Sequence, residues 1–191
     1  MKGIIFTEFM ELVEREFGLT VLNNILDAAN DSGVYTAVGS YDHQRLLRLI
    51  HALSHVTGMP IAELQQHFGE AVFAHLLASL PPHASLIKSQ TCFQFIRHVE
   101  EYIHVEVKKL YPDANPPRFS FLFETEQRLE MNYQSGRCMA HVCLGLIQGC
   151  ARHFGEQIDV EMTALDESSS KVNFVLTRQT AHSTTISSTL T

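Results

Sequence analysis

The stretch Asn115–Arg137, NPPRFSFLFETEQRLEMNYQSGR, decides the fold class, because its apolar residues recur at every second position. Three phenylalanines alternate with other residues from 119 to 123, and Leu129, Met131 and Tyr133 alternate with polar residues further on. A repeat of two is that of a β-strand, whose successive side chains point to opposite faces. Glu124–Gln127 separates the two runs and predicts a hairpin loop. We therefore predict two antiparallel strands here.

Before this stretch the apolar residues recur at helical spacing instead. Asp42 has the side chain of an N-cap residue, Pro60 suits the first position of a helix, and Pro81-Pro82 closes the block. The predicted helices are Ile4–Phe17, Val21–Ala29, His43–Val56, Ile61–Phe68 and Glu70–Leu80.

The longest uninterrupted helix is predicted at Thr91–Tyr111. On an α-helical wheel of 100° per residue, His104 lies about 100° from the centre of the apolar stripe. It therefore sits on the flank of the buried face, where an inward role as a metal ligand is permitted but not required. The stripe consists of Ile96, Val99, Ile103, Val107 and Leu110.

After the first hairpin, Cys138–Phe154 is apolar on most sides and predicts a deeply buried helix. A second hairpin is predicted from Glu156–Ala164 and Lys171–Arg178, around the loop 166–170. The fold class is therefore α+β: an N-terminal helical subdomain followed by an antiparallel sheet with embedded helices. We expect one domain over residues 1–178, with a helical part at 1–82 and a long helix and sheet part at 90–178. The Ser/Thr-rich end, 179–191, is predicted to be a disordered tail.

Composition excludes several classes of partner. The net charge of −7 argues against nucleic acid and anionic membranes, which attract basic proteins. A hydrophobic content of 45% with 12 phenylalanines predicts a packed core. We find neither a signal peptide nor a membrane span, and the four cysteines contain no CxxC pair, which favours reduced thiols in a cytoplasmic protein. Eleven scattered histidines do not by themselves indicate a metal site.

The segment Tyr133-Gln134-Ser135-Gly136-Arg137 is a candidate binding site. At strand period Tyr133, Ser135 and Arg137 project to the same side, which aligns a phenol, a hydroxyl and a guanidinium. Such a row suits a ligand with two carboxylates on an apolar body, and haem with its propionates is one example. The alternative is an ordinary strand-to-helix junction whose arginine pairs with a local glutamate.

Taken together, the motifs resemble the haem–nitric oxide/oxygen binding (H-NOX) family from residue 1 to about 178. The resemblance implies haem b bound between the helical part and the sheet, with His104 as the axial iron ligand. It also implies that Tyr133, Ser135 and Arg137 bind the propionates, while Pro117 and Ile5 press on the two faces of the porphyrin. The matching motifs are Met1–Phe6, Ile103-His104, Pro116-Pro117-Arg118, Tyr133-x-Ser135-x-Arg137 and Leu144–Gly149.

The resemblance also implies which gas binds. Relatives that bind oxygen place a tyrosine at the position of Val142, whereas Val142, Leu146 and Phe9 here offer no hydrogen-bond donor. We therefore expect nitric oxide and carbon monoxide to bind and oxygen to be retained poorly. His141 is interpreted as a packed histidine; if it reached the iron, the oxygen argument would fail. Residues 156–178 contain neither Cys nor His, so we predict no zinc cluster there.

The function that this implies is a sensor rather than an enzyme. Nitric oxide weakens the bond opposite it, so His104 would leave the iron and the helices would shift relative to the sheet. A separate protein, such as a histidine kinase or a cyclic-di-GMP enzyme, would read the shift. Two alternatives remain open: a haem enzyme of the peroxidase type, which needs a distal acid–base pair, and a haem-free carrier of hydrophobic ligands.

Overall fold

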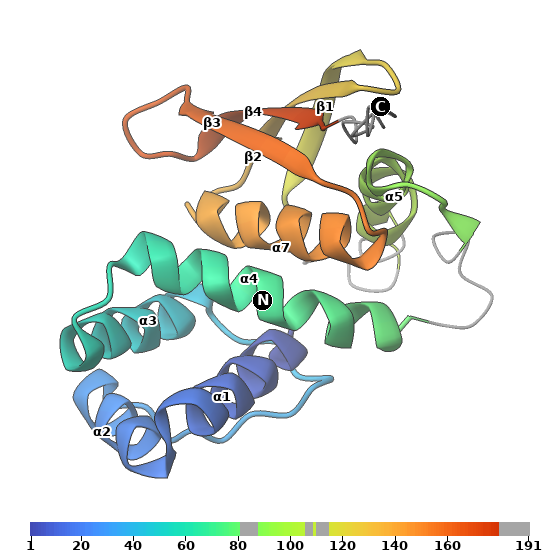
Figure 1. The fold of residues 1–191 in the computed structure, drawn as a ribbon. Coiled ribbons are helices and arrows are strands. Elements are labelled where there is room, and N and C mark those ends of the chain that lie inside the picture. The colour runs from blue at the N-terminus through green and yellow to red at the C-terminus, as the bar shows by residue number, and fades with distance from the viewer. Residues whose placement is uncertain (81–87, 106–108, 110–114, 180–191) are drawn as a thin grey trace, which may run out of the picture.

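Helices cover one face of a four-stranded antiparallel sheet in the computed structural model, which describes residues 1–80, 88–105, 109 and 115–179 (Figure 1). The helix α4 runs between a group of three N-terminal helices and α7, and α7 lies against the sheet. The α+β class predicted from the sequence is confirmed. The helical elements are α1 (Gly3–Phe17), α2 (Leu19–Ala29), α3 (His43–Thr57), α4 (Ile61–Ala78), α5 (Cys92–His98), the π-helical η2 (Val99–His104) and α7 (Ala140–His153), and the strands are β1 (Arg118–Glu124), β2 (Arg128–Gln134), β3 (Ile158–Ala164) and β4 (Lys171–Arg178).

The sheet has the order β1-β2-β4-β3, and both predicted hairpins are present. In the central strand β2, Leu129, Met131 and Tyr133 are buried and alternate with less buried neighbours. Met131 pairs with Phe174 of β4, and Tyr133 pairs with Phe119 of β1. The two-residue repeat therefore gives the sheet an apolar face that packs against α7 and α5.

The N-terminal helices form where the spacing predicts them. Asp42 caps α3, because its side chain accepts a hydrogen bond from the Gln44 amide at 3.0 Å, and Gly58 ends that helix with φ 74°. The prediction of separate helices at 61–68 and 70–80 is wrong, because α4 is continuous through Gly69. Pro60 also precedes this helix as its N-cap instead of opening it.

Glycines allow α4 and α7 to cross with their backbones in contact. A Cβ at Gly69 would lie 2.2 Å from the carbonyl oxygen of Val142, and one at Gly145 would lie 1.9 Å from that of Gln66. Only glycine lets two helices approach this closely. The crossing joins two apolar cores, one among α1–α4 and one among α5, α7 and the sheet.

The helix predicted at Thr91–Tyr111 begins as expected but changes its winding. Thr91 caps α5 by accepting a hydrogen bond from the Gln94 amide, and the helix becomes π-helical from Val99 to His104. An i→i+5 turn takes up one residue more than an α-helical turn, so the residues after it lag by about 100°. His104 is thereby turned from the flank onto the buried face.

Several predictions lie outside the described residues. These are the closing Pro81-Pro82, the end of the long helix at 106–108 and 110–111, and the tail at 180–191. Within the described ranges, no helix is long and apolar enough to cross a membrane.

Candidate functional site

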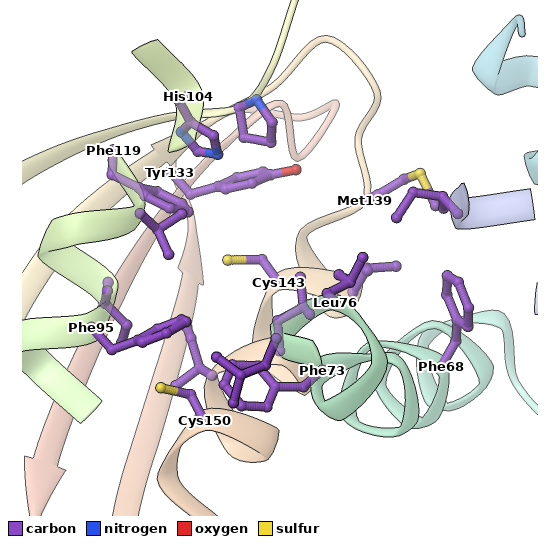
Figure 2. Close-up of a pocket in the computed structure, with 18 of the residues that line it drawn as sticks. Phe68, Phe73, Leu76, Phe95, His104, Phe119, Tyr133, Met139, Cys143 and Cys150 are labelled. Carbon is purple, nitrogen blue, oxygen red and sulfur yellow. The ribbon is translucent and has the colours of Figure 1, made fainter. Parts of the chain in front are cut away.

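A cavity of about 390 Å³ lies where the helical part meets the sheet part, and its size is that of a small-molecule pocket. Its lining comes from α1, α4, α5, η2, β1, β2 and α7 and is mostly apolar. In Figure 2, His104 and Tyr133 lie on one side of the cavity, and Phe68, Phe73 and Leu76 of α4 lie on the other. The polar and thiol side chains among the described lining residues are Ser79, His104, Tyr133, Arg137, Cys143 and Cys150.

His104 has the geometry of a metal ligand. Its side chain is only 15% exposed, its ring lies 5.5 Å from that of Phe119, and it lines the cavity. The Nδ1 atom lies 2.7 Å from a carboxylate oxygen of Glu100. The Nε2 atom makes no hydrogen bond to any residue that the structure describes. One imidazole nitrogen is therefore held by the protein and the other is available to a metal in the cavity.

Tyr133 and Arg137 line the same cavity and provide donors for an anion. Burial raises the pKa of Tyr133 to about 12, so its phenol stays protonated and can donate a hydrogen bond. Burial lowers the pKa of Arg137, although a guanidinium remains charged at neutral pH. Its guanidinium makes no ion pair or hydrogen bond within the described part of the chain, so the alternative of a local glutamate partner does not hold there.

Ser135 lies just after the strand, where the chain turns towards Arg137. The strand β2 ends at Gln134 and residues 136–137 form a turn, so the strand repeat does not extend to Arg137. The Ser135 amide still donates to the Ser170 carbonyl at 2.8 Å, in the register of the β2–β4 pairing, and its hydroxyl accepts from the Arg137 amide at 3.2 Å. Ser135 is buried but does not line the cavity. It shapes the loop from which Arg137 reaches the cavity.

The other residues singled out in the sequence are mostly brought together. Ile5, Pro117, Val142 and Leu146 line the cavity. Phe9 does not, because it is buried one layer behind, with its ring 5.4 Å from that of the lining residue Phe68. The described lining residues on α4 and α7 contribute only carbon side chains and thiols, and the hydroxyl of Ser79, directly after α4, already donates to the Leu76 carbonyl at 2.7 Å.

His141 points elsewhere. It is half-buried and does not belong to the cavity lining, and burial lowers its pKa. The two thiols on the same helix, Cys143 and Cys150, do line the cavity, and burial raises the pKa of Cys143 to about 12. A thiol with so high a pKa stays protonated and unreactive. These cysteines act as apolar wall, as their spacing indicates.

Sequence reasoning missed two kinds of residue. The α4 side chains Phe68, Phe73 and Leu76 have the same apolar pattern as core residues, so nothing in the sequence marks them as pocket lining. Glu100 did carry a signal, because an acid four residues before a histidine lies on the same side of a helix.

The residues present fit haem. An apolar cavity suits a planar macrocycle, His104 offers one free imidazole nitrogen, and Tyr133 with Arg137 offers donors for two carboxylates.

Comparisons with known proteins agree with this fit. The family model described as haem-NO-binding matches residues 2–162. Among curated proteins, no match to the chain is found.

The solved structures similar to the chain are H-NOX proteins. That of K. algicida, unliganded in the Fe(II) state, is 35% identical with a TM-score of 0.87 over 94% of this chain and 97% of that chain. That of Shewanella woodyi, bound to IWP-051 in the Fe(II)CO state, is 36% identical with a TM-score of 0.79 over 97% and 98%. That of S. oneidensis, in the Fe(II)NO state, is 25% identical with a TM-score of 0.82 over 94% and 100%. The chain therefore belongs to the H-NOX family of haem-NO-binding proteins, and its cofactor is haem.

Proposed function

We propose that this protein senses nitric oxide through ferrous haem, and that His104 holds the iron through its Nε2 atom. One observation carries the proposal: His104 lines the cavity with Nδ1 held by Glu100 and with Nε2 free of any described partner. Ferrous haem supplies an iron site that binds nitric oxide, and nitric oxide weakens the iron bond on the opposite side. Two relatives in the same family, those of S. oneidensis and Shewanella woodyi, have been solved in the Fe(II)NO and Fe(II)CO states respectively.

The propionates are assigned to Tyr133, Ser135 and Arg137, and the Ser135 hydroxyl also holds the loop by accepting from the Arg137 amide. Arg137 provides a fork of parallel N–H donors that matches a carboxylate, and Tyr133 adds an O–H donor. Ile5 and Pro117 line the cavity from different parts of the chain and would contact the faces of the macrocycle.

Selectivity for nitric oxide over oxygen follows from the absence of a free hydrogen-bond donor among the described lining side chains of α4 and α7. A hydrogen-bond donor in the cavity would favour oxygen at the haem, whereas nitric oxide would depend on such a donor far less. Val142 and Leu146 lie one helical turn apart on α7 and present only methyl groups, and Phe9 stands behind Phe68. We expect carbon monoxide to bind as well.

The signal is carried by the release of His104. His104 would tie η2 to the haem iron, and Glu100 ties η2 to β1 by accepting from the Phe119 amide at 3.1 Å. Loss of the iron–histidine bond would free η2 from the cavity and let the helical part shift relative to the sheet. A ligand biases two such states only through a difference in affinity, which the broken bond provides. The partner that reads the shift is a separate signalling protein, such as a histidine kinase or a cyclic-di-GMP enzyme.

An enzyme of the peroxidase type is the less favoured alternative, because its distal acid–base pair has no counterpart in the described lining. His141 lies outside the cavity, and Arg137 stands on the loop after β2. The haem-free carrier loses its support with membership of a haem-binding family.

The test is to add nitric oxide to the reduced protein and record absorption and electron paramagnetic resonance spectra. We expect five-coordinate iron whose resonance lacks the splitting from a second axial nitrogen, because His104 has left. Carbon monoxide, which weakens the opposite bond much less, is the matched control and should leave the histidine bound. A nitric oxide spectrum that keeps the histidine splitting would refute the release mechanism.

A further inference from the structure

Glu100 makes two contacts that converge on one carboxylate oxygen. Its Oε2 atom lies 2.7 Å from His104 Nδ1, and the same atom accepts the Phe119 backbone N–H at 3.1 Å. Both side chains are largely covered, with 26% of Glu100 and 15% of His104 exposed. The carboxylate is therefore anchored to β1 on one side and to the imidazole on the other.

The Glu100 carboxylate determines which nitrogen of the His104 ring carries the proton. A carboxylate oxygen accepts hydrogen bonds, so the contact assigns the N–H to Nδ1 of His104. In that tautomer the lone pair is on Nε2, the atom without a described hydrogen-bond partner. A bond from N–H to a full negative charge also moves electron density into the ring and makes Nε2 a stronger donor.

We propose that Glu100 is a positioning residue for His104: it fixes the tautomer and direction of the ring, strengthens the iron–histidine bond, and thereby sets how readily nitric oxide breaks that bond. The proposal rests on the proposed function. It concerns the negative charge of Glu100 as well as its shape, because a second-sphere partner that orients a metal-binding histidine also raises the basicity of the ligand.

The neighbouring Glu101 provides an internal comparison. It lies on the same π-helical segment, is half-exposed, and faces Arg97 at 3.7 Å instead of the cavity. A long-range effect of losing one negative charge from η2 would be similar for Glu100 and Glu101. An effect through the hydrogen bond to His104 belongs to Glu100 alone.

The experiment compares Glu100→Gln, Glu100→Ala and the control Glu101→Gln in the haem-loaded protein. The first readout is the iron–histidine stretching frequency of the reduced protein without gas, measured by resonance Raman spectroscopy. The second is the rate of haem transfer to an excess of a haem-free acceptor protein. We expect a lower frequency in both Glu100 variants and faster haem loss, by about 10- to 100-fold in Glu100→Ala. Glu101→Gln should match the wild type in both.

Glu100→Gln decides between a positioning and a merely structural role. The amide oxygen of glutamine can still accept both hydrogen bonds, so a structural role predicts a wild-type frequency, and that result would overturn the proposal. A lower frequency in Glu100→Gln, with unchanged thermal stability, supports it. If the frequency is unaffected while nitric oxide still expels the histidine, the proposal fails and the proposed function stands. If the reduced protein has no iron–histidine band at all, the proposed function fails first.

Discussion

Replacing Gly145 with alanine tests the backbone contact on which the arrangement of α4 and α7 depends. The new Cβ would lie 1.9 Å from the Gln66 carbonyl oxygen and 2.7 Å from the Glu70 amide nitrogen. Ordinary contacts of a Cβ begin near 3.4 Å, so the helices need to separate by about 1.5 Å at this point. These are backbone atoms, which cannot swing aside as the end of a flexible side chain can.

We expect Gly145→Ala to lower the free energy of unfolding by about 3 kcal/mol, at the upper end of the usual cost of overpacking. For a chain of this length that loss corresponds to a fall in Tm of about 6–12 °C. Thermal unfolding followed by circular dichroism measures it. The matched control is Gly136→Ala, since a Cβ at Gly136 meets nothing within 4 Å and its φ is not positive. If the two variants unfold within about 1–2 °C of each other, the close-approach argument is wrong.

Three further predictions concern the pocket and the N-terminal core. Val142→Tyr adds a donor to the apolar wall, so oxygen should leave the reduced protein about 10- to 100-fold more slowly in stopped-flow measurements, and an unchanged rate would contradict the selectivity argument. Arg137→Ala should raise the rate of haem transfer to an acceptor protein by about 10- to 100-fold, whereas Arg128→Ala, half-exposed on β2, should not; equal rates in the two would count against the propionate assignment. Burial raises the pKa of Asp31, but hydrogen bonds led by that from Arg45 outweigh burial and hold the pKa at about 2. Because this pKa is depressed, its stabilising contribution is full above pH 3.8 and is lost as the pH falls towards 2. Asp31→Asn should therefore lower the free energy of unfolding at neutral pH by about 2–3 kcal/mol, which is less than for a fully buried pair because Arg45 is partly solvated. It should also flatten the dependence of that free energy on pH between 4 and 2, as measured by denaturant titrations. An unaltered pH profile would refute the assignment.

The strands could be predicted because their evidence is local. Alternation over Leu129–Tyr133 gives the buried positions of β2, and Phe119 and Phe121 of β1 pack against the same core. Phe123 departs from the pattern, because the register shifts between Phe121 and Phe123 and its side chain is exposed. The N-cap at Asp42 and the stop at Gly58 are likewise decided within a few residues. Sequence patterns report these features directly because no distant part of the chain determines them.

Other features depend on contacts far away in the sequence. Gly69 predicts a break between two helices, but it lies inside α4, where the backbone of α7 leaves no room for a side chain. The chain turns away from the strand at 136–137, directly after the Ser135 amide has bonded to the Ser170 carbonyl, 35 residues later, in the register of β2 and β4. Neither partner is visible in the local pattern.

The position of His104 in the cavity is likewise not predicted by the local sequence pattern. A regular α-helix leaves it on the flank of the apolar stripe, and the π-helical turn of Val99–His104 rotates it further towards the cavity that it lines. The resemblance to the H-NOX family identified His104 without that geometry. The geometry adds the free Nε2 atom and the contact of Nδ1 with Glu100.

The central claim, that His104 holds the iron, is tested most directly by the absorption spectrum of the reduced His104→Gly variant with and without added imidazole. His98→Ala is the control, because His98 lies on the same helical run and bonds to the Ser89 hydroxyl at 2.8 Å. We predict that His104→Gly loses the spectrum of histidine-ligated ferrous haem and that imidazole restores it, while His98→Ala keeps the wild-type spectrum. A wild-type spectrum from His104→Gly without imidazole would contradict the account.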